Sequence, residues 1–357
     1  MFFTAEYLVH NSARRRGLKV SPTARSGARG VLYYVAVFAG IGFFQRRAKM
    51  FRAVRDLAVP AMLGIMAFAT TTAHCQQPSP GAVEAVTIVT VVGKNSRQRT
   101  VTLPKDDVLV YEGQVRKRVM GWVPARDQHS VLQLAIVIDD ADGKKFGHQL
   151  EELRKFILAQ PPTTSVGIYY ALGGHLQAAA QINPDHQTVA KALRLPMGSS
   201  GDLVSVYDPV MQLIAGWPNT SARREILLIT EGYDFLHHER FSSDLQATVD
   251  AAQHAGILIH TIFVIARRLL PDSDDIGRSN LFQIAEETGG APLLGDARTP
   301  ESFAPLLSQL ETALGNQYFL VWATSPSKRK GGELRSFKIR VEEENVRTIA
   351  PKKAFVP

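Results

Sequence analysis

The central part of the chain alternates long apolar runs with segments whose apolar residues recur at helical spacing. The apolar runs of strand length are VLQLAIVI (131–138), SVGIYYAL (165–172), REILLIT (224–230) and ILIHTIFVI (257–265). Continuous apolar runs of this length are typical of strands buried on both faces. HLQAAAQI, after the glycine pair at 173–174, is expected to pair with the second run.

In the segments between the strands, apolar residues recur at helical spacing. Leu150, Leu153 and Ile157 keep one-face spacing, and the helix over 244–256 is expected to end at Gly256. Further helices are predicted at about 185–194, 205–216, 279–290 and 300–314. Strand and helix in alternation predict an α/β domain over 128–315, in which a mostly parallel central sheet is flanked by helices.

Both ends of the mature chain are rich in β-branched residues. Strands are predicted at 86–92, 99–103, 107–113 and 115–123 before the α/β domain, and at 317–324, 334–342 and within 346–356 after it. The first set is too small to hold a core alone. We expect the flanking segment 83–127 and the C-terminal strands of 316–357 to pair into one small β-rich subdomain.

The first 82 residues have the pattern of a leader. The apolar run 57–69 has the length of a signal-peptide core, with basic residues from Met50 before it and small residues after it. We therefore predict upstream or leader sequence at 1–49, a signal peptide at 50–75 and a linker at 76–82. An uncleaved N-terminal anchor and lipidation at Cys75 stay open, although His74 stands where a lipidation signal wants a small residue.

Charge and cysteine content narrow the function classes. The net charge of +8 lies in the leader, because Lys and Arg nearly balance Asp and Glu beyond residue 56. The mature chain therefore lacks the basic surface of a nucleic-acid binder. The single cysteine excludes a disulfide framework and a multi-cysteine zinc site. The adjacent His237 and His238 are interpreted as a solvated surface pair.

Acidic and hydroxyl side chains follow two of the predicted strands. Asp139, Asp140 and Asp142 come at the end of the first strand, and Thr230 and Glu231 at the end of the third. Ligands of open α/β sheets bind outside the carboxyl ends of strands. Oxygen ligands gathered there suit a hard cation such as Mg²⁺. The alternative is that Asp139 and Asp142 cap the next helix and form its turn.

The order of these segments resembles the von Willebrand factor type A (VWFA) domain. The resemblance rests on the Asp-rich turn after an apolar strand, then RREILLITEGYD, AGILIHTIFVI, LFQIAEETGGAPLL and NQYFLVW, and it covers about 83–357. Residues 83–125 and the tail ending in AFVP are similar to the VWFA-related exported proteins of acidobacteria. The resemblance implies a Rossmann-type α/β fold and a metal-ion-dependent adhesion site that binds protein partners.

The residues of that adhesion site are only partly present. Asp139 matches the first Asp of the family's Asp-x-Ser-x-Ser motif, but Ala141 and Gly143 stand at the two serine positions. Ser205 falls nearest the second-loop hydroxyl, and Glu231 replaces the third-loop Asp. The resemblance therefore implies a degenerate site of Asp139, Asp142, Ser205 and Glu231, with Mg²⁺ or Mn²⁺ bound weakly or not at all.

A phosphohydrolase of the haloacid-dehalogenase type is the competing interpretation. DADGK at 140–144 is similar to its first motif, which would make Asp140 the nucleophile and Asp142 the general acid. Thr230 would hold the phosphoryl group, and Asp274 and Asp275 would bind metal. Lys144 stands where that family has Thr, and the acid pair does not directly follow a strand.

The favoured prediction is an exported, non-enzymatic adhesion-type module with a protein partner. It would meet a membrane only through the leader or an anchor, and it would not bind nucleic acid. A structural envelope protein, whose sheet edge is inert, is the remaining alternative.

Overall fold

The computed structural model describes residues 81–94, 102–140, 147–197, 204–237, 240–265, 272–295 and 299–357. These residues belong to one compact unit, Ala73–Pro357. The predicted leader at 1–75 and most of the predicted linker lie outside the described residues. No helix of the described part is both long and apolar enough to cross a lipid bilayer.

A six-stranded sheet forms the centre of the α/β part. Its strands are β5 (Leu132–Asp139), β6 (Thr164–Leu172), β7 (His175–Asn183), β8 (Arg223–Thr230), β9 (Ile257–Phe263) and β10 (Pro292–Leu293). The spatial order is β10-β9-β8-β5-β6-β7. Every neighbouring pair is parallel except β6 and β7, which form an antiparallel pair at one edge. The predicted mostly parallel sheet is confirmed.

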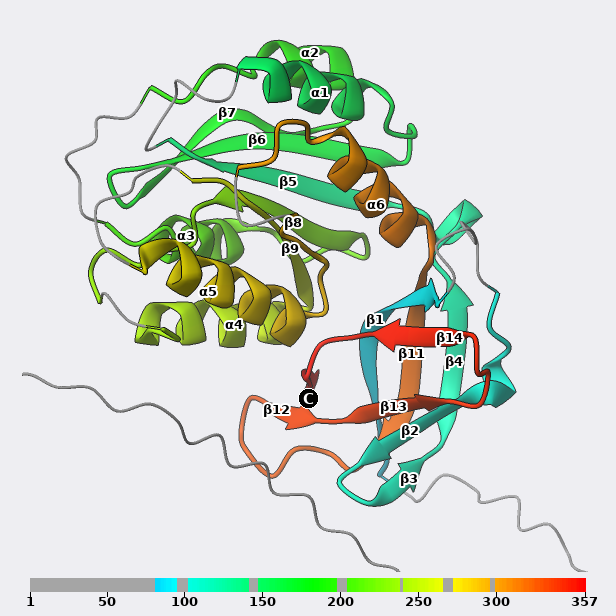
Figure 1. Cartoon of the computed structure of the whole chain (residues 1–357). Helices are drawn as coiled ribbons and strands as arrows, with labels where there is room; N and C mark the ends of the chain where they lie inside the picture. The colour runs from blue at the N-terminus through cyan, green and yellow to red at the C-terminus, as the bar shows by residue number, and fades with distance from the viewer. Residues whose placement is uncertain are drawn as a thin grey trace, which may run out of the picture. The chain divides into compact units, whose positions relative to one another are not determined.

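Helices cover both faces of this sheet (Figure 1). One face carries α1 (Gly147–Leu158), α2 (His186–Lys191) and α6 (Ala304–Gly315), and the other carries α3 (Tyr207–Gly216), α4 (Ser243–Ala255) and α5 (Ser273–Thr288). Successive side chains of a strand point to opposite faces. Ile136 and Ile138 therefore pack with the first group of helices, and Ala135 and Val137 pack with the second.

The helix boundaries differ from the predictions at α2, α5 and α6, and α6 begins at Ala304 and not at 300. The helix α4 ends at Gly256 with a left-handed φ of 67°, as predicted. The helix α5 begins at Ser273, before the predicted start at 279, because its polar first turns show no apolar periodicity. Gly277 there packs against the backbone of Glu231, which a side chain would block. The helix α2 is shorter than predicted and starts from Asp185, whose carboxylate accepts from two backbone amides.

The two ends of the described chain supply the remaining strands. They are β1 (Val83–Gly93), β2 (Val108–Glu112), β3 (Val115–Lys117), β4 (Val119–Pro124), β11 (Gln317–Thr324), β12 (Glu333–Ser336), β13 (Lys338–Val341), β14 (Val346–Ile349) and β15 (Lys353–Val356), with short 3-10 helices at Lys105–Asp107 and Asp127–His129. They form sheets of order β14-β1-β11-β4, β13-β2-β3 and β12-β15. Strands from before and after the α/β part therefore pair, while the division into separate domains stays a prediction.

Some strand predictions at the two ends were wrong in detail. Residues 99–101 lie outside the described residues, and Leu103 is not in a strand but is buried, with its carbonyl accepting from the Trp122 indole at 2.8 Å. The segments 115–123 and 334–342 each divide into two strands. In the second case the break falls at Phe337, which turns inward so that its ring centroid lies 4.8 Å from that of Trp322.

A buried polar network joins the central sheet to β11. Glu225 of β8 is fully buried and accepts from the Gln317 side chain at 3.0 Å. The His260 imidazole lies 2.6 Å from the same carboxylate, and Arg223 also pairs with Glu225 and hydrogen-bonds to Gln317. Because the backbone amide of Ala291 donates to His260 Nδ1, His260 donates to Glu225 through Nε2. This network fixes the start of β11 against the core.

Candidate functional site

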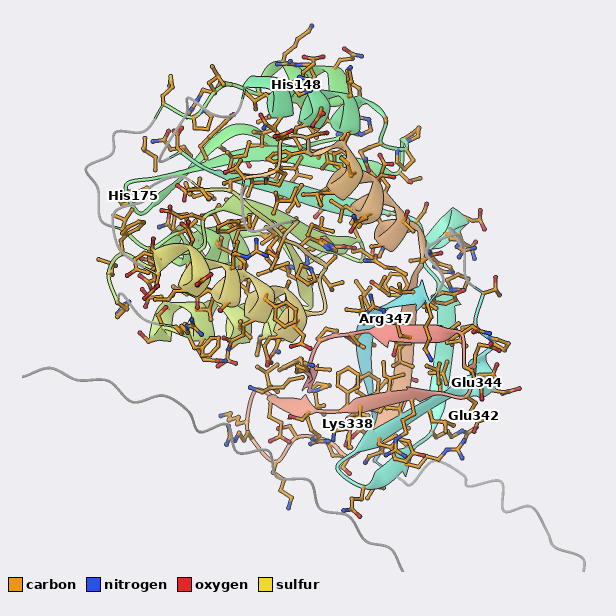
Figure 2. The ribbon with its side chains drawn as sticks, viewed as in Figure 1. His148, His175, Lys338, Glu342, Glu344 and Arg347 are labelled. Atoms are coloured by element: carbon orange, nitrogen blue, oxygen red, sulfur yellow. The ribbon has the colours of Figure 1, made fainter. Side chains whose placement is uncertain are left out.

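The carboxyl edge of the central sheet has a topological switch point between β5 and β8. From β5 the chain crosses to β6 on one side, and it later returns as β8 on the other. Such a point is where open α/β sheets bind ligands. Figure 2 labels His175, which begins β7 just after the carboxyl end of β6 and so marks this edge.

The structure brings two of the predicted residues together at the switch point. The Thr230 hydroxyl donates to Asp139 Oδ2 at 2.8 Å, and the amide of Gly232 donates to the Thr230 hydroxyl at 3.2 Å. The adjacent carboxyl ends of β5 and β8 are thereby tied to each other. Asp139 has a defined hydrogen-bonding role in this edge even without a metal.

The other predicted metal ligands are distributed differently. Asp142, together with Ala141 and Gly143, lies outside the described residues. Ser205 is fully buried, and its hydroxyl accepts from the Tyr207 amide at 3.3 Å, in the turn that begins α3. Glu231 is only 2% exposed. The metal site of Asp139, Asp142, Ser205 and Glu231 stays a prediction.

A family-type Mg²⁺ site does not fit the donors that this edge offers. Two hydroxyl positions of the motif carry Ala141 and Gly143, and Asp139 Oδ2 already accepts from Thr230. Mg²⁺ demands near-octahedral oxygen coordination. We therefore derive no binding step through a metal at Asp139.

Asp140 forms a structural ion pair with Arg194. It is fully buried, and the Arg194 guanidinium donates to its two oxygens at 3.0 and 2.8 Å, while the Met197 amide donates at 2.5 Å. The guanidinium also lies 3.8 Å from the centroid of the Tyr170 ring. The hydrogen bond that Arg194 donates to Asp140 is the main cause that raises the pKa of Arg194. The Asp140 carboxylate, held in this way, is not available as the nucleophile of the phosphohydrolase hypothesis.

The acid pair of that hypothesis, Asp274 and Asp275, lies in the first turn of α5.

A cluster of an imidazole and two carboxylates lies near this edge and was missed by the sequence analysis. Ligand atoms of Asp234, His237 and Asp244 all lie within 4.8 Å of one another, the sole such group found among the described His, Cys, Asp and Glu residues. Asp234 and His237 belong to the loop after β8, and Asp244 to the first turn of α4. His237 is therefore not simply a solvated residue. The sequence signal was the spacing of Asp234 and His237, but only the fold adds Asp244.

Exposed apolar side chains surround the same edge. Leu195 and Met197 follow α2 and are 48% and 73% exposed, and the Met197 amide places them beside the end of β5. Leu236 and Phe241 flank the start of α4 and are 52% and 55% exposed. The Phe241 amide donates to the Asn280 side chain, which itself donates to the Gly232 carbonyl. Large apolar side chains exposed together are typical of an interaction surface.

Comparison with known proteins yields distant structural similarities only. No family model and no curated protein matches the chain. The chain is similar to the vWF domain of the type V pili tip protein Mfa5 from Porphyromonas gingivalis, at 10% identity and a TM-score of 0.36, over 54% of this chain and 95% of that one. The pilus adhesin SpaC from Lactobacillus rhamnosus GG is 9% identical with a TM-score of 0.36, over 63% of this chain and 44% of that chain.

A third similarity comes from a different class of protein. The human COPII-coat protein Sec24c is 8% identical with a TM-score of 0.39, over 66% of this chain and 44% of that chain. Similarities of this size leave the function of this chain to be argued from its own residues. The resemblance to acidobacterial exported proteins stays a prediction.

Proposed function

We propose that this chain is an exported, non-enzymatic protein-binding module of the VWFA type, which contacts its partner with the carboxyl edge of the central sheet. The observation that carries the proposal is the set of exposed apolar side chains at that edge: Leu195, Met197, Leu236 and Phe241. Methionine and aromatic residues are enriched at protein interfaces. Apolar contacts of this kind need no metal, which suits an adhesion site that has lost its hydroxyl ligands.

The polar residues of the edge support a binding role rather than catalysis. Asp140 is held by Arg194, and Asp139 accepts from Thr230, so each carboxylate has a stabilising partner. Export follows from the predicted signal peptide at 50–75, whose apolar core and basic flank are features of the sequence alone.

The test replaces two apolar side chains of the edge. The full chain is immobilised, and envelope and extracellular proteins of the source cell that bind it are quantified by mass spectrometry. We expect a specific partner whose recovery falls about tenfold in the variant Met197→Ser/Phe241→Ser, because central apolar contacts carry most of the binding free energy.

A matched control carries two apolar-to-serine changes at the opposite edge. Val131, just before β5, and Leu158, the last residue of α1, are also exposed. The variant Val131→Ser/Leu158→Ser should keep full recovery of the partner. Equal recovery with both variants, or equal loss, would contradict a contact surface at the carboxyl edge.

A further inference from the structure

The cluster of Asp234, His237 and Asp244 has the composition of a site for a transition metal. His237 Nδ1 lies 3.1 Å from Asp234 Oδ2 and 3.5 Å from Asp244 Oδ2. One imidazole nitrogen and two carboxylate oxygens therefore converge from two elements, the loop after β8 and the helix α4. An imidazole in the donor set favours Zn²⁺ and its first-row neighbours over Mg²⁺ or Ca²⁺, which prefer oxygen alone.

Among the described residues, lysine and arginine do not balance the charge of the cluster, and the cation that pairs with its carboxylates is His237 itself when protonated. Asp234 is fully buried, and no described lysine or arginine forms an ion pair with Asp208, Asp234 or Asp244. A carboxylate buried without a compensating charge is costly. The cluster thus has an excess of negative charge that a divalent cation would neutralise.

Residues 232–237, which include two of these ligands, are held in place by hydrogen bonds. The Gly232 carbonyl accepts from the Tyr207 hydroxyl at 2.7 Å and from Asn280 at 3.2 Å, and both donors are buried. The backbone amides of Leu236 and His237 donate to Asp234 Oδ1 at 3.0 and 3.4 Å. The orientation of the Asp234 carboxylate is therefore set before any ligand arrives, as is usual for metal ligands with outer-shell partners.

We propose that Asp234, His237 and Asp244 form a binding site for a single divalent transition-metal ion of the Zn²⁺ class. His237 is the ligand exposed enough to admit the ion, since its side chain is 37% accessible, while Asp234 forms the buried wall. The ion would join the loop after β8 to the start of α4. Leu236 lies between two of the ligands, so the ion would also fix an apolar side chain of the carboxyl edge. The site is independent of the predicted Mg²⁺ site at Asp139.

The experiment measures Zn²⁺ bound to the untagged full chain. The protein is stripped with a chelator, titrated with Zn²⁺ by calorimetry, and its absorption spectrum is recorded with Co²⁺ as a substitute. We expect one Zn²⁺ per chain, a rise in melting temperature, and Co²⁺ absorption bands of a site with nitrogen and oxygen ligands. A ligand that binds the native state alone stabilises that state, so the melting temperature should rise with the concentration of Zn²⁺.

The control is a second histidine beside a carboxylate. His148 of α1 lies 3.4 Å from Glu152 and its side chain is 75% exposed (Figure 2). His237→Ala and Asp244→Asn should each weaken Zn²⁺ binding at least tenfold, whereas His148→Ala and Asp139→Ala should leave it unchanged. Circular dichroism verifies that each variant is folded.

Three outcomes would overturn the site. They are no stoichiometric Zn²⁺ on the wild-type chain, undiminished binding in a folded His237→Ala variant, and an equal loss in His148→Ala. A loss of Zn²⁺ binding leaves the proposed partner contact open, because that contact is tested separately with Met197 and Phe241. The two proposals can therefore fail independently.

Discussion

At the scale of single residues, two neighbouring aspartates at the end of β5 have different partners. Asp139 lies at the edge of the sheet and accepts from Thr230, whereas Asp140 points into the protein and binds Arg194. Successive residues of an extended chain point in opposite directions, which explains the difference. Asp140 and Arg194 connect the end of β5 to the segment that carries Leu195 and Met197. This ion pair is therefore expected to support the proposed contact surface.

Removing Arg194 should be much more destabilising than removing a surface arginine. Arg194→Ala leaves the buried carboxylate of Asp140 without its cation, so we expect the free energy of unfolding to fall by about 3 kcal/mol. Arg154→Ala, which removes the exposed pair with Glu151 and a 3.4 Å hydrogen bond to the Ala190 carbonyl, should lower it by at most about 1 kcal/mol. Urea unfolding measures both. Losses of similar size would mean that the Asp140 pair contributes no more than a surface pair.

At the scale of elements, the two ends of α4 determine the direction of the chain next to the candidate metal site. Ser242 begins the helix by accepting from the Leu245 amide, and Gly256 ends it in the left-handed region. The first turn places Asp244 beside His237, and the last turn leads directly into β9. Both ends are determined by local chemistry, so α4 could be predicted closely from the sequence.

A substitution at Gly256 tests the left-handed end of α4. Gly256→Ala should lower the free energy of unfolding by about 1 kcal/mol, because a Cβ is disfavoured at a φ of 67°. Gly216 at the end of α3 is a matched control, since neither glycine has an atom within 4 Å of the added Cβ and only Gly256 has a positive φ. Gly216→Ala should therefore be neutral or slightly stabilising. Thermal melting of both variants distinguishes backbone strain from crowding.

At the scale of the whole molecule, Glu225 joins the core of the central sheet to β11. Burial by itself would raise the pKa of Glu225, but the hydrogen bond from His260, the charge of Arg223 and the hydrogen bond from Gln317 lower it below the ordinary value of 4.5. The strand β11 in turn pairs with both β1 and β4. Deleting 316–357 would therefore remove a central strand, so truncation cannot test the alternative of a structural envelope protein.

The lowered pKa of Glu225 predicts how stability depends on pH. The unfolded chain takes up the proton first, so this contribution is complete above pH 4.5 and is lost as the pH falls through the lower folded pKa. Glu225→Gln should lower the free energy of unfolding by about 3 kcal/mol at pH 7 and flatten the acid limb of the curve of stability against pH. Glu342→Gln, at an exposed glutamate, should change neither the free energy of unfolding at pH 7 nor the acid limb. Denaturant unfolding between pH 3 and 7 measures both quantities, and an unchanged acid limb in Glu225→Gln would contradict the prediction.

The fold was more predictable than the site. The predictions were correct for the apolar strands between residues 131 and 265 and for the one-face residues Leu150, Leu153 and Ile157, because burial leaves a local periodic pattern. The start of α5 was missed because its first turns are stabilised by a close approach of Gly277 to the loop after β8, which no local pattern records. At the site, Thr230 and Asp139 were placed at one sheet edge by the parallel topology, and they meet there.

The order and type of the elements, the face that each element buries, and the edge at which the strands end all follow from the amino-acid sequence. These depend on side-chain periodicity, chain direction and helix ends, all of which are local. Three contacts, by contrast, arise from the packing of distant segments: Arg194 neutralises Asp140, Gln317 hydrogen-bonds to Glu225, and Asp244 lies beside Asp234 and His237. Such contacts join residues whose separation along the chain varies freely, so their chemistry becomes visible only when packing brings them together.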